Sequence, residues 1–177
     1  MKKFSAFMML IFILPIGTLF LGCGSLPKDE IIKSPNKIFV YYDGSPIEIS
    51  KDDKIFKEII ELTNKRIDKD KISTAQDVVS ENYVDSLKKE KLSLEFLYEE
   101  EQQMNLTGDG FMPMKYTKLF FPLVINENSN YDQSSTISTF QYGTAQGYTD
   151  CSRGSLKESK ELVDLIMNEI VNKQLNL

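Results

Sequence analysis

Runs of β-branched and aromatic residues come in groups along this chain, and helical periodicity occurs only between and after those groups. Strands that follow one another through short connections favour antiparallel pairing, because a parallel pair needs a long crossover. The predicted order of elements is β-β-α-α-β-β-β-α. We therefore expect an α+β fold, with an antiparallel sheet of about five strands and two or three helices packed on one face.

The predicted strands are rich in Val, Ile, Phe and Tyr or alternate apolar with polar residues, and they span residues 38–42, 47–49, 92–98, 115–125 and 136–142. Asp43 to Pro46 is turn-forming and predicts a hairpin. Pro122 has no N–H to donate, so it indicates an edge position, a bulge or the end of its strand. Residues 143–154 form a glycine-bearing loop with room for a short strand near Tyr148.

Three helices are predicted. Residues 54–66 place apolar side chains at three- and four-residue spacing, after a capping box at Ser50–Asp53. A shorter helix spans residues 80–89, after a charged linker at 67–74. The last helix begins at the capping box Ser155–Glu158 and reaches about Lys173.

The N-terminal run MKKFSAFMMLIFILPIGTLFLGC has two lysines, an apolar body from Phe4 to Leu21, and Gly22 directly before Cys23. A charged start followed by an apolar body is typical of an export signal. Two helix-breaking residues, Pro15 and Gly17, argue against one uninterrupted membrane-spanning helix.

The end of this run, Leu19-Phe20-Leu21-Gly22-Cys23, resembles the lipobox of bacterial lipoproteins, which prefers leucine where Phe20 stands. The resemblance covers residues 1–23 only. It implies cleavage before Cys23 and lipidation of its thiol, with acyl chains such as palmitate that hold the protein on the cell membrane, facing the extracytoplasmic side. The alternatives are an uncleaved anchor and an ordinary signal cut elsewhere.

This resemblance divides the chain into a signal peptide (1–22), an acylated N-terminus with a flexible tether (23–37) and one globular domain (38–177). Loss of Lys2 and Lys3 with the signal changes the net charge from −5 to −7. An acidic domain lacks the positive surface that nucleic acid requires, so we expect no nucleic-acid partner.

Composition also limits the chemistry. The chain has two cysteines and no histidine. With Cys23 lipidated, Cys151 has no partner for an internal disulfide, and a lone thiol is more often a small buried side chain than a nucleophile. Without histidine, the usual general base and the commonest metal ligand are missing. We expect no cofactor and no metal site.

Two groups of polar residues are candidates for chemistry. Glu95 with Glu99–Glu101 is either a carboxylate cluster or a solvated acidic strand end, and the second is favoured. Ser86-Leu87-Lys88-Lys89 matches the S-x-x-K pattern of penicillin-binding enzymes, but the companion elements are missing, which favours an ordinary exposed helix.

Six tyrosines fall on or near predicted strands, at positions 41, 42, 98, 116, 142 and 148. They are either half-buried strand residues or an aromatic contact surface on one face of the sheet.

These observations favour a membrane-anchored extracytoplasmic lipoprotein that acts as a non-enzymatic protein- or ligand-binding module, with an envelope protein as its partner. One alternative is a small-ligand sensor or inhibitor that uses residues 99–113 and 143–154. Another is a histidine-free envelope hydrolase, which needs two carboxylates of raised proton affinity, such as Glu95 and Asp150.

Overall fold

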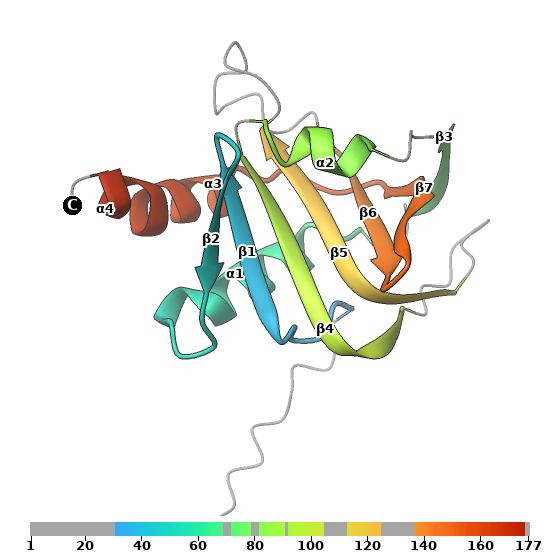
Figure 1. Cartoon of the computed structure of the whole chain (residues 1–177), viewed down its shortest axis with the longest axis horizontal. Coiled ribbons are helices and arrows are strands. Elements are labelled where there is room, and N and C mark those ends of the chain that lie inside the picture. Colours follow the sequence, from blue (N-terminus) through green and yellow to red (C-terminus); the bar gives the residue numbers. More distant parts are fainter. Residues whose placement is uncertain are drawn as a thin grey trace, which may run out of the picture.

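The computed structural model of the chain describes residues 31–68, 72–78, 82–90, 92–104, 113–124 and 137–175. Seven strands in these ranges pair into one sheet, antiparallel throughout, in the order β2-β1-β4-β5-β6-β7-β3 (Figure 1). The strands are β1 (Lys37–Tyr42), β2 (Ser45–Ile49), β3 (Ser73–Val78), β4 (Leu92–Met104), β5 (Met114–Val124), β6 (Thr139–Thr144) and β7 (Gly147–Gly154). The helices are α1 (Lys54–Lys65), α2 (Tyr83–Leu87), α3 (Lys160–Ile166), the π-helical turn η2 (Met167–Val171) and α4 (Asn172–Leu175).

The predicted hairpin is present and has a two-residue turn. Asp43 and Gly44 both have positive φ, at 46° and 79°, which suits the tight turns that follow the right-handed twist of paired strands. Tyr42 pairs with Ser45, so the turn is shorter than the predicted Asp43–Pro46 segment.

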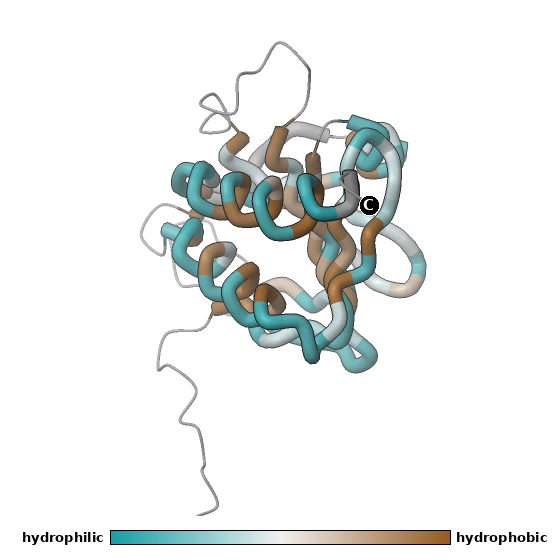
Figure 2. The backbone as a smooth tube through the Cα atoms, turned by 90° about the vertical axis from the view of Figure 1, so that its left-hand side faces the viewer, coloured by the Kyte–Doolittle hydropathy of each residue, from teal (hydrophilic) through white to brown (hydrophobic). Residues whose placement is uncertain are grey.

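The two faces of the sheet are covered differently. In Figure 1, α1 and α3 lie behind the sheet and α2 lies in front of it. The main core fills the space behind, where buried side chains of α1 and α3, such as Ile59 and Ile166, join those of the central strands, such as Phe96 and Phe121. A smaller cluster of Val84, Leu87 and Phe120 lies beneath α2. Figure 2 shows hydrophobic and hydrophilic residues alternating along the helices, as expected where one face is buried.

The predicted α+β class, with an antiparallel sheet and two helices on one face, is confirmed. The sheet has seven strands in place of about five, and the short helix covers the opposite face. The added strands come from segments whose sequence lacks strong alternation. Strand β3 begins in the last two residues of the predicted linker, and β7 occupies most of the predicted loop 143–154.

Pro122 lies close to an irregularity, as predicted. It pairs with Ser93 on β4, next to a shift of register between Leu92 and Ser93. On the other side of β5, pairing with β6 runs only from Lys118 to Phe120, so no β6 residue pairs with the proline.

The last helix begins later than predicted. Its first residue is Lys160, and Ser155 is exposed without capping it. The backbone of Leu156 donates to the Ser138 carbonyl at 2.7 Å, and that of Lys157 donates to the Arg66 carbonyl at 2.6 Å. These bonds hold Leu156 and Lys157 against neighbouring segments in place of a first helical turn, so the helix does not begin at the predicted capping box.

The end of the predicted tether is part of the folded structure. Ile32 is fully buried, and the backbone N–H groups of Ile31 and Ile32 donate to Asn64 Oδ1 on α1 at 3.0 and 2.8 Å. Asn64 Nδ2 donates back to the Ile32 carbonyl at 3.0 Å. Residues 31–37 therefore lie against the domain, contrary to the flexible tether predicted for them.

Candidate functional site

A buried carboxylate lies on the face of the sheet that α2 covers. Leu94 and Phe96 on β4 point into the main core, so Glu95 between them points to the opposite face. Its exposed fraction is only 5%. A buried charge is costly unless it is paired and hydrogen-bonded, so the groups around Glu95 determine its role.

Three side chains from three elements meet this carboxylate. Lys88, just after α2, lies 2.8 Å from Oε1, and the Tyr41 hydroxyl on β1 donates to Oε2 at 2.6 Å. The Tyr148 hydroxyl on β7 also donates to Oε1. We refer to Tyr41, Lys88, Glu95 and Tyr148 as the Glu95 cluster.

Aromatic rings complete the surroundings of Lys88. Its ammonium lies 5.0 Å from the ring centre of Tyr41, 5.7 Å from that of Tyr148 and 6.0 Å from that of Phe120. These distances are in the range of cation–π attraction. Helix α2 brings the lysine into place, because Val84 and Leu87 pack on Phe120 and the Lys88 N–H donates to the Val84 carbonyl at 2.9 Å.

The pKa shifts of the groups in the Glu95 cluster do not suit acid–base catalysis near neutral pH. Burial alone would raise the pKa of Glu95, but hydrogen bonds from Lys88, Tyr148 and Tyr41 outweigh it and lower this pKa below the ordinary value. Burial and the neighbouring carboxylate raise the pKa of both Tyr41 and Tyr148. At neutral pH the glutamate is ionised and the tyrosines are protonated, so the cluster joins α2, β1, β4 and β7.

The lowered pKa of Glu95 makes its contribution to stability depend on pH. The contribution is complete above the unfolded-state pKa, near 4.5, and is lost as the pH falls through the lower folded-state value. We expect Glu95→Gln to lower the free energy of unfolding by about 2 kcal/mol at pH 7, and the gap to the wild type to shrink towards pH 3.

Urea unfolding at a series of pH values measures this difference. Glu101→Gln is the control, because its salt bridge to Lys115 is exposed. A gap between wild type and Glu95→Gln that stays constant from pH 7 to pH 3 would contradict the ionised state of Glu95.

The structure separates the predicted carboxylate cluster. Glu99, Glu100 and Glu101 are exposed near the end of β4, as expected for a solvated strand end, whereas Glu95 is buried among its own partners. Asp150 is exposed, and the raised proton affinity that the hydrolase alternative needs is not found at Glu95.

The serine and lysine of the S-x-x-K pattern, Ser86 and Lys89, are both exposed, as expected. Ser86 donates to the Tyr83 carbonyl at 2.7 Å, and Lys88, an intervening residue of the pattern, turns inward to Glu95. Cys151 is half-buried in place of fully buried, and partial burial together with the Asp150 carboxylate raises the pKa of its thiol. A thiol that holds its proton more tightly is a poor nucleophile.

The tyrosines do not form one aromatic surface. Tyr98 and Tyr116 are buried in the main core, edge to face with ring centres 5.2 Å apart. Tyr41 and Tyr148 lie on the opposite face beside Glu95. The alternative of an aromatic contact surface on one face is therefore wrong, and the other alternative, half-buried strand positions, describes most of these residues.

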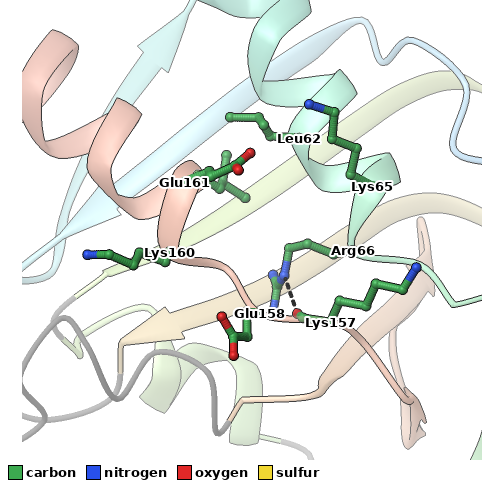
Figure 3. Close-up of a pocket in the computed structure, with 8 residues that line it drawn as sticks. Leu62, Lys65, Arg66, Lys157, Glu158, Lys160 and Glu161 are labelled. Carbon is green, nitrogen blue, oxygen red and sulfur yellow. Dashed lines mark hydrogen bonds between the residues drawn. The ribbon is translucent and has the colours of Figure 1, made fainter.

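A second polar feature, missed in the sequence, is a pocket between the end of α1 and the start of α3 (Figure 3). Its volume is about 390 Å³, and it is lined by Leu62, Lys65, Arg66, Lys157, Glu158, Lys160, Glu161 and Leu162. Arg66 is only 2% exposed. Its Nε donates to the Lys157 carbonyl at 3.2 Å, and Nη2 donates to the Ile137 carbonyl at 2.9 Å.

Burial lowers the pKa of Arg66 to about 10, and no neighbouring carboxylate offsets this effect. Its Nη1 has no hydrogen-bond partner within the described residues. The sequence does not predict that Arg66 is buried, because a basic residue at the end of an amphipathic helix is usually exposed.

Cys23, the predicted lipidation site, lies outside the described residues. Across the ranges that the structure describes, no helix is both long and apolar enough to span a membrane. No group of three or more Cys, Asp or Glu side chains in those ranges could hold a metal ion.

The sequence matches no model of a protein family and no curated protein. Its fold resembles a solved structure, that of YycH from Bacillus subtilis, with a TM-score of 0.55 and 14% sequence identity. The likeness covers 85% of this chain and 40% of YycH.

At this identity, the likeness to YycH shows a shared fold and does not transfer a site. The aligned part of this chain is most of its length, so the arrangement of sheet and helices seen here also occurs within a larger protein. This chain spans well under half of YycH.

Proposed function

We propose that this protein is a lipid-anchored extracytoplasmic lipoprotein whose domain binds another envelope protein without catalysis. The observation that carries the proposal is how soon the fold begins after the lipobox. Ile31 and Ile32, bonded to Asn64, already belong to the domain. Ile31 follows Cys23 by only eight residues.

This short connection limits where the domain works. Eight extended residues reach about 28 Å at most, whatever the conformation of residues 24–30. A lipidated Cys23 would therefore keep the domain close to the bilayer, where a membrane protein or a protein of the adjacent envelope is its natural partner.

The chemistry of the described residues supports binding over catalysis. Glu95, the most buried carboxylate, has its charge balanced by Lys88 and its oxygens occupied by two tyrosines. A general acid or base needs a proton affinity near the working pH and access to substrate, and this glutamate has neither.

Crosslinking in intact cells tests the binding role. The expected result is one dominant membrane or envelope protein that co-purifies with the anchored chain and is identified by mass spectrometry. It should be lost, or reduced on the order of tenfold, from a secreted form that lacks Cys23, because tethering raises the effective concentration of the partner.

The anchored chain with Glu101→Gln is a control for altered surface charge and should retain the partner. Absence of any protein above background from the anchored chain would contradict a protein-binding role. If the secreted form recovers as much of the partner as the anchored chain does, the anchor is not needed for the interaction.

A further inference from the structure

The pocket beside Arg66 combines a buried guanidinium with a mixed charged rim. Four cationic residues and two acidic ones line it, a net charge of +2 in a chain whose overall charge is −5. Its volume of about 390 Å³ lies within the range of small-molecule sites. The half-buried Leu62 supplies an apolar part of the wall, whereas Leu162 is almost completely buried.

Arg66 is the unusual member. A buried cation normally faces a carboxylate, but the hydrogen bonds of Arg66 go to two backbone carbonyls, and Nη1 has none within the described part of the chain. An unpaired buried donor costs free energy that a bound acceptor would recover. The pocket therefore has a reason to attract a negative group.

The charged residues at the rim of the pocket limit which kind of negative group can bind. Lys65 and Lys157 are exposed and form no salt bridge with any described residue. Glu158 and Glu161 line the same pocket and would repel a multiply charged anion such as phosphate. In Figure 3 the Arg66 side chain points toward the segment that leads into α3, and the lysine ammonium groups spread around the edge.

We propose that this pocket binds the carboxylate of an amino acid or short peptide. The lysines and Arg66 attract the carboxylate, the two glutamates accept from the nitrogen donors of the ligand, and Leu62 contacts an apolar side chain. Since Nη1 is enclosed, the carboxylate contacts the rim lysines, and a hydrogen bond to Nη1 requires a shift of the surrounding side chains. The inference rests on the proposed binding role of the domain but not on its anchor or its protein partner.

Calorimetry on the detergent-solubilised full-length protein tests it, with leucyl-leucine as the probe. Leucyl-leucinamide, which lacks the carboxylate, should bind at least about tenfold more weakly, because a charge-assisted contact is lost. The double variant Lys65→Gln/Lys157→Gln should weaken binding of leucyl-leucine by a similar factor.

The double variant Lys51→Gln/Lys54→Gln is the matched control. It removes the same charge from exposed lysines around the start of α1, away from the pocket, and should change the affinity less than about twofold, since exposed charges are screened by salt. Arg66→Lys should weaken binding of leucyl-leucine. In the wild type, the guanidinium NMR signals of Arg66 should shift when leucyl-leucine is added.

Four results would overturn the proposal: no binding of leucyl-leucine, equal affinity for the amide, equal loss in the control variant, or inorganic phosphate binding as tightly as the dipeptide. Because the measurement is made in solution, its failure leaves the crosslinking result intact, and the two proposals fail separately.

Discussion

Replacing Glu95 with alanine is expected to lower the free energy of unfolding by about 3 kcal/mol, the largest stability loss that we predict for a polar residue of this chain. The change leaves the Lys88 ammonium without its counter-ion and the hydroxyls of Tyr41 and Tyr148 without their acceptor. The side chain of Lys88 is 22% exposed, so water recovers part of the loss.

Urea unfolding at pH 7 measures this effect, and Glu101→Ala provides the matched control. The Lys115–Glu101 salt bridge has a similar length, 3.0 Å, but its side chains are 67% and 50% exposed. We expect Glu101→Ala to cost less than about 1 kcal/mol. Equal losses from the two variants would contradict the view that burial makes the Glu95 cluster important.

Amide exchange provides a second measurement of Glu95→Ala. Helix α2 has only five residues, too few to be stable alone, so it depends on Val84, Leu87 and Lys88 packing against the sheet. Loss of Glu95 should speed exchange of the Lys88 amide far more than that of amides in β5. Uniform acceleration would instead indicate global unfolding.

A double-mutant cycle isolates the interaction between the two charges. Glu95→Gln and Lys88→Met each leave one charge unpaired, whereas the double variant leaves none. The double variant should therefore be more stable than the sum of the single losses predicts, with a coupling free energy of about 1–3 kcal/mol. A coupling near zero would show that the tyrosine hydrogen bonds stabilise the cluster without the lysine.

Local patterns made most of the fold predictable. Helix α1 follows directly from apolar residues at helical spacing, and β1, β4 and β5 follow from dense β-branched and aromatic runs. The first four residues of β3, Ser-Thr-Ala-Gln, have no such pattern. Pairing with β7 forms that strand, and this tertiary contact is not visible in the local sequence.

The Glu95 cluster could not be assembled from the sequence for the same reason. Tyr41 and Tyr148 lie 54 and 53 residues from Glu95, and only the strand order brings them together. The one available signal was a glutamate between Leu94 and Phe96 in a nearly apolar strand. With α2 covering the second face, that position becomes buried, so the expectation of a solvated strand end fails at Glu95 while it holds for Glu99–Glu101.

Replacing Cys23 with alanine is expected to abolish lipid attachment, the largest functional effect that we predict. Two acyl chains contribute about 0.8 kcal/mol for each buried methylene, which is enough for stable anchoring. The variant should therefore be released from the membrane or remain as an uncut precursor.

Labelling of cells with radioactive palmitate, followed by fractionation, is the measurement that tests the anchored binding module most directly. The wild type should carry the label and stay with membranes until detergent is added, and Cys151→Ala, which removes the other cysteine, should behave in the same way. Cys23→Ala should carry no label. If the Cys23→Ala variant is processed, labelled and membrane-bound as before, the lipid anchor at Cys23 is wrong, and with it the placement of this domain at the membrane.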